Sequence, residues 1–463
     1  MSSANSLNLS LPAQLPMGSG MARAPSTINT SSERSGQLAR DSAVAMVTTW
    51  TTYVAGAVGG LVLARTLSPE GKGLYALLFL AGILAGAAGT FGTDLWSTKE
   101  AANQGIAGNV PEVVKFHLEM VTMVLVVLGL AAWLVTAPIL GRPAPTGLIA
   151  VLVLTIASVW AVSLAALMRG TRDMRNLLKM HALTAAVFLF GIGCLAAMDR
   201  ITVLSALYLA SGAKVIGSFV GPWKHVLTSQ RATVDVWWAV VRGHVSSSVG
   251  VLAEFVSYRV DILFVALFLS TTEVGLYSVA LPLSELLWLI PNALAQVLLP
   301  HVAKSGSSEA TVIAIRLATL TSIVGAAILV LFAIPILHLL YGDAYRDAAV
   351  TIPFLAGGAV VLTVWKLVTT DLLARGHSSI RAHGGVLGIA VLCATLPILA
   401  PRFGLRGAAA SSMLAYAAAA THGITRWKQL PGSNVRDLIP GRKEDWLAIR
   451  RFVVQRSTKM ETT

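Results

Sequence analysis

Long apolar runs recur along almost the whole chain. A membrane-spanning helix needs about 20 mainly apolar residues. Twelve such runs can be placed in this sequence, at about 42–64, 74–96, 117–140, 147–168, 181–198, 201–221, 244–269, 276–300, 317–340, 348–373, 384–400 and 407–427. Only 12% of the 463 residues are charged, against roughly 25% in an ordinary soluble domain. The chain is therefore predicted to be an all-α integral membrane protein with about twelve transmembrane helices.

Polar segments at both ends and in the middle divide the chain. Residues 1–41 are rich in Ser, Asn, Thr and Pro and lack an apolar core, which predicts a disordered cytoplasmic tail rather than a cleaved signal. The expected parts that follow are an N-terminal six-helix bundle at 42–221, a cytoplasmic connection at 222–243, a C-terminal six-helix bundle at 244–427 and a basic cytoplasmic tail at 428–463. That last tail mixes aromatic and basic residues, so an interfacial helix and a solvated basic tail both stay open.

The net charge of +13 is distributed unevenly between the two sides of the predicted membrane. With a cytoplasmic N-terminus, 25 Lys and Arg residues fall in the inner segments and 7 in the outer ones. This is the positive-inside pattern, and it predicts that both termini are cytoplasmic. The placement of the basic residues therefore favours a membrane topology and no nucleic-acid partner. The remaining cations, Lys214, Arg259 and Lys366, fall inside predicted spans.

The two predicted bundles are related by an internal repeat. ARTLSPEGKGLYAL begins at Ala64 and ALFLSTTEVGLYSV begins at Ala266, an offset of 202. LMRG at 167–170 and LARG at 373–376 form a second match. Six helices in each half place both halves in the same orientation, so the repeat is parallel. Transporters built in this way place the substrate path between the halves, which predicts two parallel six-helix halves around a central cavity.

The repeated segments resemble a known family. ARTLSPEGKGLYAL is similar to the first outer turn of the bacterial polysaccharide, or O-antigen, flippases, and YRVDILFVALFLSTTEVGLYSVALPLSELLWLIPNALAQVLLP is similar to their seventh and eighth helices. They belong to the multidrug/oligosaccharidyl-lipid/polysaccharide exporter superfamily, which also contains multidrug and toxin extruders and peptidoglycan-precursor flippases. The resemblance covers roughly 42–427 and rests on loop glycines, helix count and the RxD element. It carries no catalytic signature.

The resemblance implies a flippase of the bacterial cytoplasmic (inner) membrane. Such a protein moves an undecaprenyl-pyrophosphate-linked oligosaccharide to the periplasmic leaflet by alternating access, for surface or exopolysaccharide biosynthesis. The implied partners are the lipid-linked oligosaccharide, the membrane, and the polysaccharide polymerase and glycosyltransferases of the same pathway.

The seventh predicted span carries charges near its middle. Glu254, Arg259 and Asp261 lie there, and a charge at the bilayer centre costs about 2.5–3.5 kcal/mol on insertion scales. Glu254 and Asp261 share a helix face with Tyr258 between them, and Arg259 points about 140° away from Glu254. These side chains are therefore expected to face water or partners on other helices. The candidate partners are Glu285, Lys366, Asp371 and Lys214.

The cations within the spans are candidates for binding a lipid-linked pyrophosphate. Arg and Lys in a wet cavity offer a phosphate charge-assisted hydrogen bonds, which makes Arg259 and Lys366 candidate phosphate contacts. The alternative for Arg259 is a purely structural pair with an internal carboxylate, and the alternative for Lys214 is to snorkel or brace. The candidate substrate-binding residues are Arg259, Lys366, Asp261, Glu254, Tyr258, Glu285 and Lys214.

Bending sites are also predicted in both halves. Pro282 and Pro291 lie in the eighth predicted span, and Gly89 matches Pro291 at the repeat offset. Proline removes a hydrogen bond from the helix, which is tolerated at membrane depth where neighbours or a cavity satisfy the carbonyl. We expect Pro282, Pro291 and Gly89 to act as hinges, although close packing is an equal alternative for the glycine.

The sequence contains no motif of bond chemistry. It has no GxxxxGK[ST] loop, no HExxH and no nucleophile elbow, which favours a non-enzyme without a cofactor. Cys194 and Cys393 lack metal-ligand spacing, so no metal site is expected. A cation-coupled multidrug exporter of the same fold stays open, because Glu254 and Asp371 could fill its carboxylate positions. A membrane enzyme of polysaccharide assembly is disfavoured by the short outer loops.

Overall fold

The computed structural model describes residues 31–107, 109–140, 143–244, 259–305, 309–377, 379–430 and 434–439, and these residues contain helices and turns but no strand. The chain divides into two compact units, Met1–Ala43 and Val44–Thr463. Within the first, helix begins at Ser31. The fold and the candidate site lie within the second.

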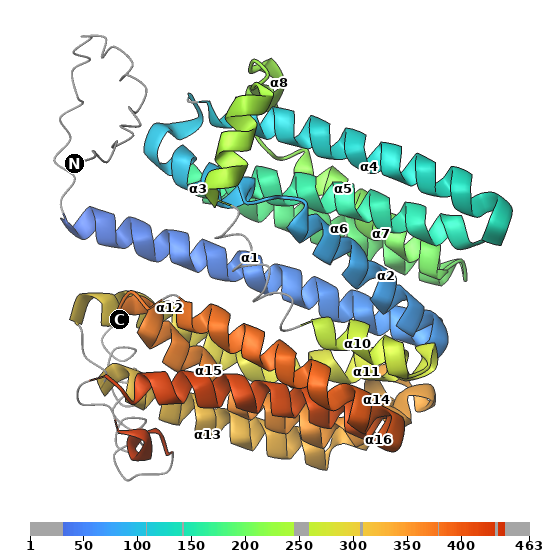
Figure 1. Ribbon diagram of the computed structural model, residues 1–463, viewed down its shortest axis with the longest axis vertical. Coiled ribbons are helices and arrows are strands. Elements are labelled where there is room, and N and C mark those ends of the chain that lie inside the picture. Colours follow the sequence, from blue (N-terminus) through green and yellow to red (C-terminus); the bar gives the residue numbers. More distant parts are fainter. Residues whose placement is uncertain are drawn as a thin grey trace, which may run out of the picture. The chain divides into compact units, whose positions relative to one another are not determined.

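The first half of the chain is a series of helices, most of them long (Figure 1). They are α1 (Ser31–Thr66), α2 (Pro69–Ala88), α3 (Thr93–Gln104), η1 (Gly105–Ala107), α4 (Val110–Leu140), α5 (Pro143–Gly170), α6 (Met174–Ala197) and α7 (Val203–Ser218). Helix α1 begins before the predicted boundary at Ser42. The second predicted span is broken at 89–92, where Phe91 and Gly92 adopt positive φ angles of 46° and 82°.

The connection between the halves is helical. It contains α8 (Trp223–Thr228) and a helix at 234–244. The indole Nε1 of Trp237 donates a hydrogen bond to Nδ1 of His117 on α4 at 3.2 Å, and both side chains are buried. The connection therefore packs against the first half.

The second half repeats the helical pattern with more interruptions (Figure 1). Its elements are α10 (Val260–Phe268), α11 (Thr271–Glu285), η2 (Leu286–Trp288), α12 (Leu289–Ser305), α13 (Glu309–Leu331), α14 (Ala333–Tyr341), η3 (Asp343–Thr351), α15 (Ile352–Ala374), α16 (Ser379–Trp427) and η4 (Val435–Leu438). Gly404 breaks α16 with a φ of 58°, which separates the predicted spans at 384–400 and 407–427. Leu438 of η4 is buried in a core cluster with residues of α12, α13 and α15.

The helices have the length and apolar character of membrane spans. Eight described segments are long and apolar enough to cross a membrane, and the other predicted spans fall on shorter, broken or partly described helices. Large apolar side chains such as Phe190 and Leu331 are about three-quarters exposed, at 76% and 75%. Exposed large apolar side chains occur along most of the long helices, and a soluble protein rarely exposes apolar surface of that extent. The all-α membrane fold with about twelve spans is confirmed.

The repeat has a structural meaning at the helix ends that the charge pattern predicts to be outer. Ser68 and Ser270 each cap the helix that follows. Helices α2 and α11 pack against each other. A Cβ added at Gly73 would overlap the carbonyl oxygen of Thr271, and one added at Gly275 would overlap that of Pro69. Glycine is required here because the two backbones touch.

Further hydrogen bonds join the halves at the same end. Arg65 of α1 donates to the carbonyl oxygens of Leu339 and Leu340 on α14. The hydroxyl of Tyr345 donates to the carbonyl oxygen of Leu67 at 3.3 Å. The outer ends of the two halves are therefore in contact in this conformation.

Candidate functional site

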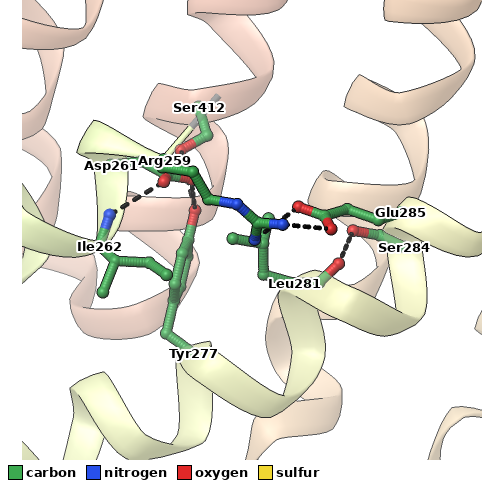
Figure 2. Close-up of polar contacts among 8 residues, drawn as sticks. All are labelled: Arg259, Asp261, Ile262, Tyr277, Leu281, Ser284, Glu285 and Ser412. Carbon is green, nitrogen blue, oxygen red and sulfur yellow. Dashed lines mark hydrogen bonds and ion pairs between the residues drawn. The ribbon is translucent and has the colours of Figure 1, made fainter. Parts of the chain in front are cut away.

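Arg259 immediately precedes α10 and forms an ion pair with Glu285 at the end of α11. Its Nη1 lies 2.8 Å from Oε1 of Glu285, and Nη2 donates to Oε2 at 2.9 Å. Figure 2 shows the two planar groups facing each other. The carboxylate side chain is 10% exposed and the arginine 29%. Of the partners considered from the sequence, the structure selects Glu285.

Asp261 lies on the other side of Arg259 in a separate network (Figure 2). Its carboxylate accepts hydrogen bonds from the hydroxyl of Tyr277 at 2.7 Å, from Ser412 at 3.3 Å and from the backbone N–H of Ile262 at 2.9 Å. The side chain is 3% exposed. The network therefore ties α10 to α11 and α16, and it satisfies a buried carboxylate that would otherwise be costly.

A small cavity adjoins Asp261. It measures about 20 Å³ and is lined by residues of α15 and α16, including Trp365, Ser412 and Tyr416. A space of this size holds about one water molecule, so it is too small for a drug or a sugar.

Lys366 belongs to α15, and its side chain reaches the break between α11 and α12. Its ammonium donates to the side-chain oxygen of Asn292 at 3.0 Å and lies 4.2 Å from the ring centroid of Trp288. Glu285 is within electrostatic reach of both Lys366 and Arg259. The two cations proposed from the sequence thus share one neighbourhood, at the point where the eighth span changes from helix to 3₁₀ turn.

Asp371 belongs to a different network near the inner end of α15. It is fully buried and accepts hydrogen bonds from Trp427 at 2.7 Å, Thr311 at 3.1 Å and Arg375 at 3.2 Å. Three donors enclose this carboxylate, which argues for a structural role and against an open cation site.

The predicted bending residues lie at or beside helix interruptions. Pro282 is inside α11, and Pro291 follows η2 in α12. Gly89 caps α2 and is the first residue of the break at 89–92. These positions are consistent with bending, and their role as hinges stays a prediction.

The remaining candidates are separate from this group or outside the described residues. Lys214 lies on α7, whose main packing partners are α2, α5 and α6, so it does not join Arg259 and Lys366. Glu254 and Tyr258 lie outside the described residues.

Sequence reasoning missed four side chains that organise the site. Tyr277 and Ser412 bind Asp261, and Trp288 and Asn292 position Lys366. One signal was present for Tyr277, because the repeat preserves it as Tyr75. The other three are uncharged and could not be distinguished from ordinary helix residues.

The described residues contain no group of three or more His, Cys, Asp and Glu side chains that could hold a metal ion. What the site presents instead is a set of cations and carboxylates, each held by partners from neighbouring helices.

Comparison with solved structures shows which fold this is. The chain is similar to "Lipid II flippase MurJ, inward closed conformation", with a TM-score of 0.69 and 12% identity over 85% of this chain and 88% of that one. It is also similar to an inward-facing multidrug resistance MATE family transporter of the MOP superfamily, with a TM-score of 0.63 and 15% identity over 81% and 94%. A mutant of the Vibrio cholerae MATE transporter VcmN gives 0.56 and 14% over 86% and 97%.

Sequence comparison identifies the family. Among curated proteins, no sequence matches the chain. A family model described as "Polysaccharide biosynthesis protein" matches residues 62–350, more than half of the chain, including the outer turn of the first half, the Arg259–Glu285 pair and the break at α11–α12. The chain therefore belongs to the polysaccharide biosynthesis protein family and has the fold of the MOP-superfamily transporters.

Proposed function

We propose that the protein is a flippase that moves an undecaprenyl-pyrophosphate-linked oligosaccharide across the bacterial cytoplasmic membrane. The observation that carries the proposal is the gathering of Arg259 and Lys366 around Glu285, at the interruption between α11 and α12. Family membership and the flippase among the structural neighbours support it.

The chemistry of the site suits an anionic headgroup. A guanidinium binds a carboxylate or a phosphate with the same fork of N–H groups. The diphosphate can therefore take the place of Glu285 on Arg259, with Lys366 adding a second charge. The hydrated oligosaccharide would follow in the space between the halves. When the diphosphate leaves, the Arg259–Glu285 pair forms again.

The helix interruptions supply the motion. Breaks at 89–92 and at Leu286–Trp288 fall in equivalent spans of the two halves. Bending there, at Gly89, Pro282 and Pro291, would separate the outer contact at Gly73 and Gly275 while the inner ends close. This is alternating access by two parallel halves.

The cellular setting follows from the charge pattern and the family. The excess of basic residues on the inner segments supports cytoplasmic positions for both termini. The flippase would act between the glycosyltransferases that build the lipid-linked unit and the polymerase that consumes it, in the synthesis of a surface or secreted polysaccharide.

A cation-coupled multidrug exporter is the second candidate, since MATE transporters share the fold. Two features of the site argue against it. Asp371, which would bind the coupling cation, is enclosed by three donors. Arg259 and Lys366 would repel a cationic drug.

Deletion of the gene distinguishes the two functions. We expect the deletion to abolish one surface or secreted polysaccharide while its lipid-linked repeat unit accumulates on the cytoplasmic side. Lys366→Glu should behave like the deletion at normal protein level. Lys428→Glu, the same charge change at an exposed position of the second half, should behave like the wild type. A deletion strain that keeps its polysaccharides and becomes sensitive to cationic dyes would show that the exporter is correct.

A further inference from the structure

Three basic side chains from three helices gather in the first half. Arg169 lies at the end of α5, His181 in the second turn of α6 and Lys214 near the end of α7. His181 is within electrostatic reach of both Arg169 and Lys214. The three helices pack against one another. At Gly217, one turn beyond Lys214, α7 is so close to α6 that an added Cβ would overlap the hydroxyl of Thr184.

This basic cluster of Arg169, His181 and Lys214 has few acceptors. Among the described residues, the ion pairs all lie elsewhere. Asp94 is within electrostatic reach of Arg169 but forms no ion pair with it. The ring Nδ1 of His181 contacts the hydroxyl of Thr52 on α1 at 3.3 Å. Arg169 is exposed, and His181 and Lys214 are partly buried, so a ligand can reach the cluster. Like charges on packed helices repel one another, so a bound anion would stabilise the cluster.

The cluster lies near the predicted inner ends of its helices and shares helix α1 with the Arg259 site. Arg169 and His181 are near the helix ends predicted to be inner, where a substrate made in the cytoplasm would enter. Helix α1 adjoins both places. Thr52 contacts His181, and the next residue, Tyr53, is within electrostatic reach of Arg259. Tyr53 is 51% exposed, so its ring is accessible to a ligand or to lipid.

We infer that Arg169, His181 and Lys214 form an entry site for the diphosphate of the lipid-linked substrate, which it occupies before it reaches Arg259 and Lys366. The inference rests on the proposed function. A diphosphate that links a lipid to a sugar carries two negative charges, and Arg169 and Lys214 supply two positive ones. Thr52 and His181 add hydrogen-bonding groups from two further helices. The phosphate of an anionic phospholipid shares this chemistry and is the competing ligand.

Calorimetric titration of the purified full-length protein with farnesyl diphosphate tests the inference, with farnesol as the probe without phosphate. The wild type should show two binding events with farnesyl diphosphate and neither with farnesol. Lys214→Gln should lose one event and Lys366→Gln the other. Lys214→Arg should keep both, because it retains the charge. Lys179→Gln, an exposed lysine on the same part of α6, should also keep both.

Each other result is decisive. Two events in Lys214→Gln would overturn the inference. A single event in the wild type that Lys366→Gln removes would overturn it and leave the proposed function intact. No binding of farnesyl diphosphate by the wild type would remove the proposed function as well. Mass spectrometry of the intact protein tests whether the competing ligand, an anionic phospholipid, binds the cluster. If Lys214→Gln loses bound phosphatidylglycerol but keeps both diphosphate binding events, the cluster binds phospholipid and the inference is wrong.

Discussion

The two halves of the molecule share a repeat but treat their buried charges differently. In the second half, Arg259 is paired with Glu285, and Asp261 and Asp371 are each enclosed by three hydrogen-bond donors. In the described part of the first half, Lys72 and Lys214 lie inside the helical bundle with no carboxylate bound to either.

The contrast is sharpest at matched positions of the repeat. Tyr277 binds Asp261, whereas its repeat mate Tyr75 has the ammonium of Lys72 5.3 Å from its ring centroid. Lys72 is itself the repeat mate of Val274, which is completely buried. The fold therefore needs a buried residue at this position but not a charged one. Paired charges in the second half hold helices together, whereas cations without acidic partners in the first half are available to an anion.

Breaking the pair in the second half should have the largest effect. Arg259→Ala leaves Glu285 buried without its partner, which costs about 3–5 kcal/mol, and we expect the protein to fail to accumulate in the membrane. Arg259→Ala combined with Glu285→Ala should recover most of the accumulation, because neither charge is left alone, but it should not recover transport. Quantifying the protein in membrane fractions and measuring polysaccharide export check both expectations. Normal accumulation of the single variant would show that the pair has no structural role.

The two halves have the same residue at one matched position, Gly73 and Gly275, where their backbones touch. Gly73→Ala would force α2 and α11 apart, and overpacking of this kind costs about 1–3 kcal/mol. The measurement uses a protein in which Cys194 and Cys393 are replaced by serine and cysteines are introduced as Pro69→Cys and Thr271→Cys. We expect a lower yield of disulfide cross-linking between the two new cysteines in Gly73→Ala than in the same protein with Gly73.

Gly56 provides the control for that experiment. A Cβ added at Gly56 would meet nothing within 4 Å, so Gly56→Ala should leave the cross-linking yield unchanged. An unchanged yield in Gly73→Ala would show that the outer ends do not need this close approach.

Removing a cation from the first half should have the smallest effect. Lys72→Met replaces a buried ammonium with an apolar chain of similar length. We expect the free energy of unfolding to fall by less than about 1 kcal/mol or to rise. Val274→Lys places a lysine at the matched position of the second half and should lower the thermal midpoint clearly. Thermal unfolding of both variants in detergent measures the difference. A large loss in Lys72→Met would reveal a structural partner for this lysine.

The spans were predictable because a bilayer imposes a simple requirement on every helix that crosses it. All twelve predicted runs fall on helices or, for 244–269, on a partly described one. The repeat was also readable, and it pointed to Ser68 and Ser270, which prove to be helix caps. The break at 89–92 was not predicted, because the span at 74–96 was placed by its apolar length alone. The start of α1 at Ser31 was not predicted, because the residues on both sides of it are polar.

The site was predictable only in its charged members. Glu285 was one of several candidate partners, since spacing along one helix does not show which neighbour faces it. Trp288, Asn292 and Ser412 carry no charge and gave no signal. The basic cluster of the first half gave no signal for a different reason: Arg169, His181 and Lys214 come from three different helices.

The sequence by itself determined that this chain enters a membrane, how many times it crosses and which face of each half is expected to be cytoplasmic, because hydropathy and charge act through the solvent and not through a particular neighbour. Only the tertiary structure decided which charges are paired, which are left to a ligand and where the halves touch. The physical reason is that an ion pair or a backbone contact forms over a few ångströms between helices distant in sequence, so its partners are set by packing.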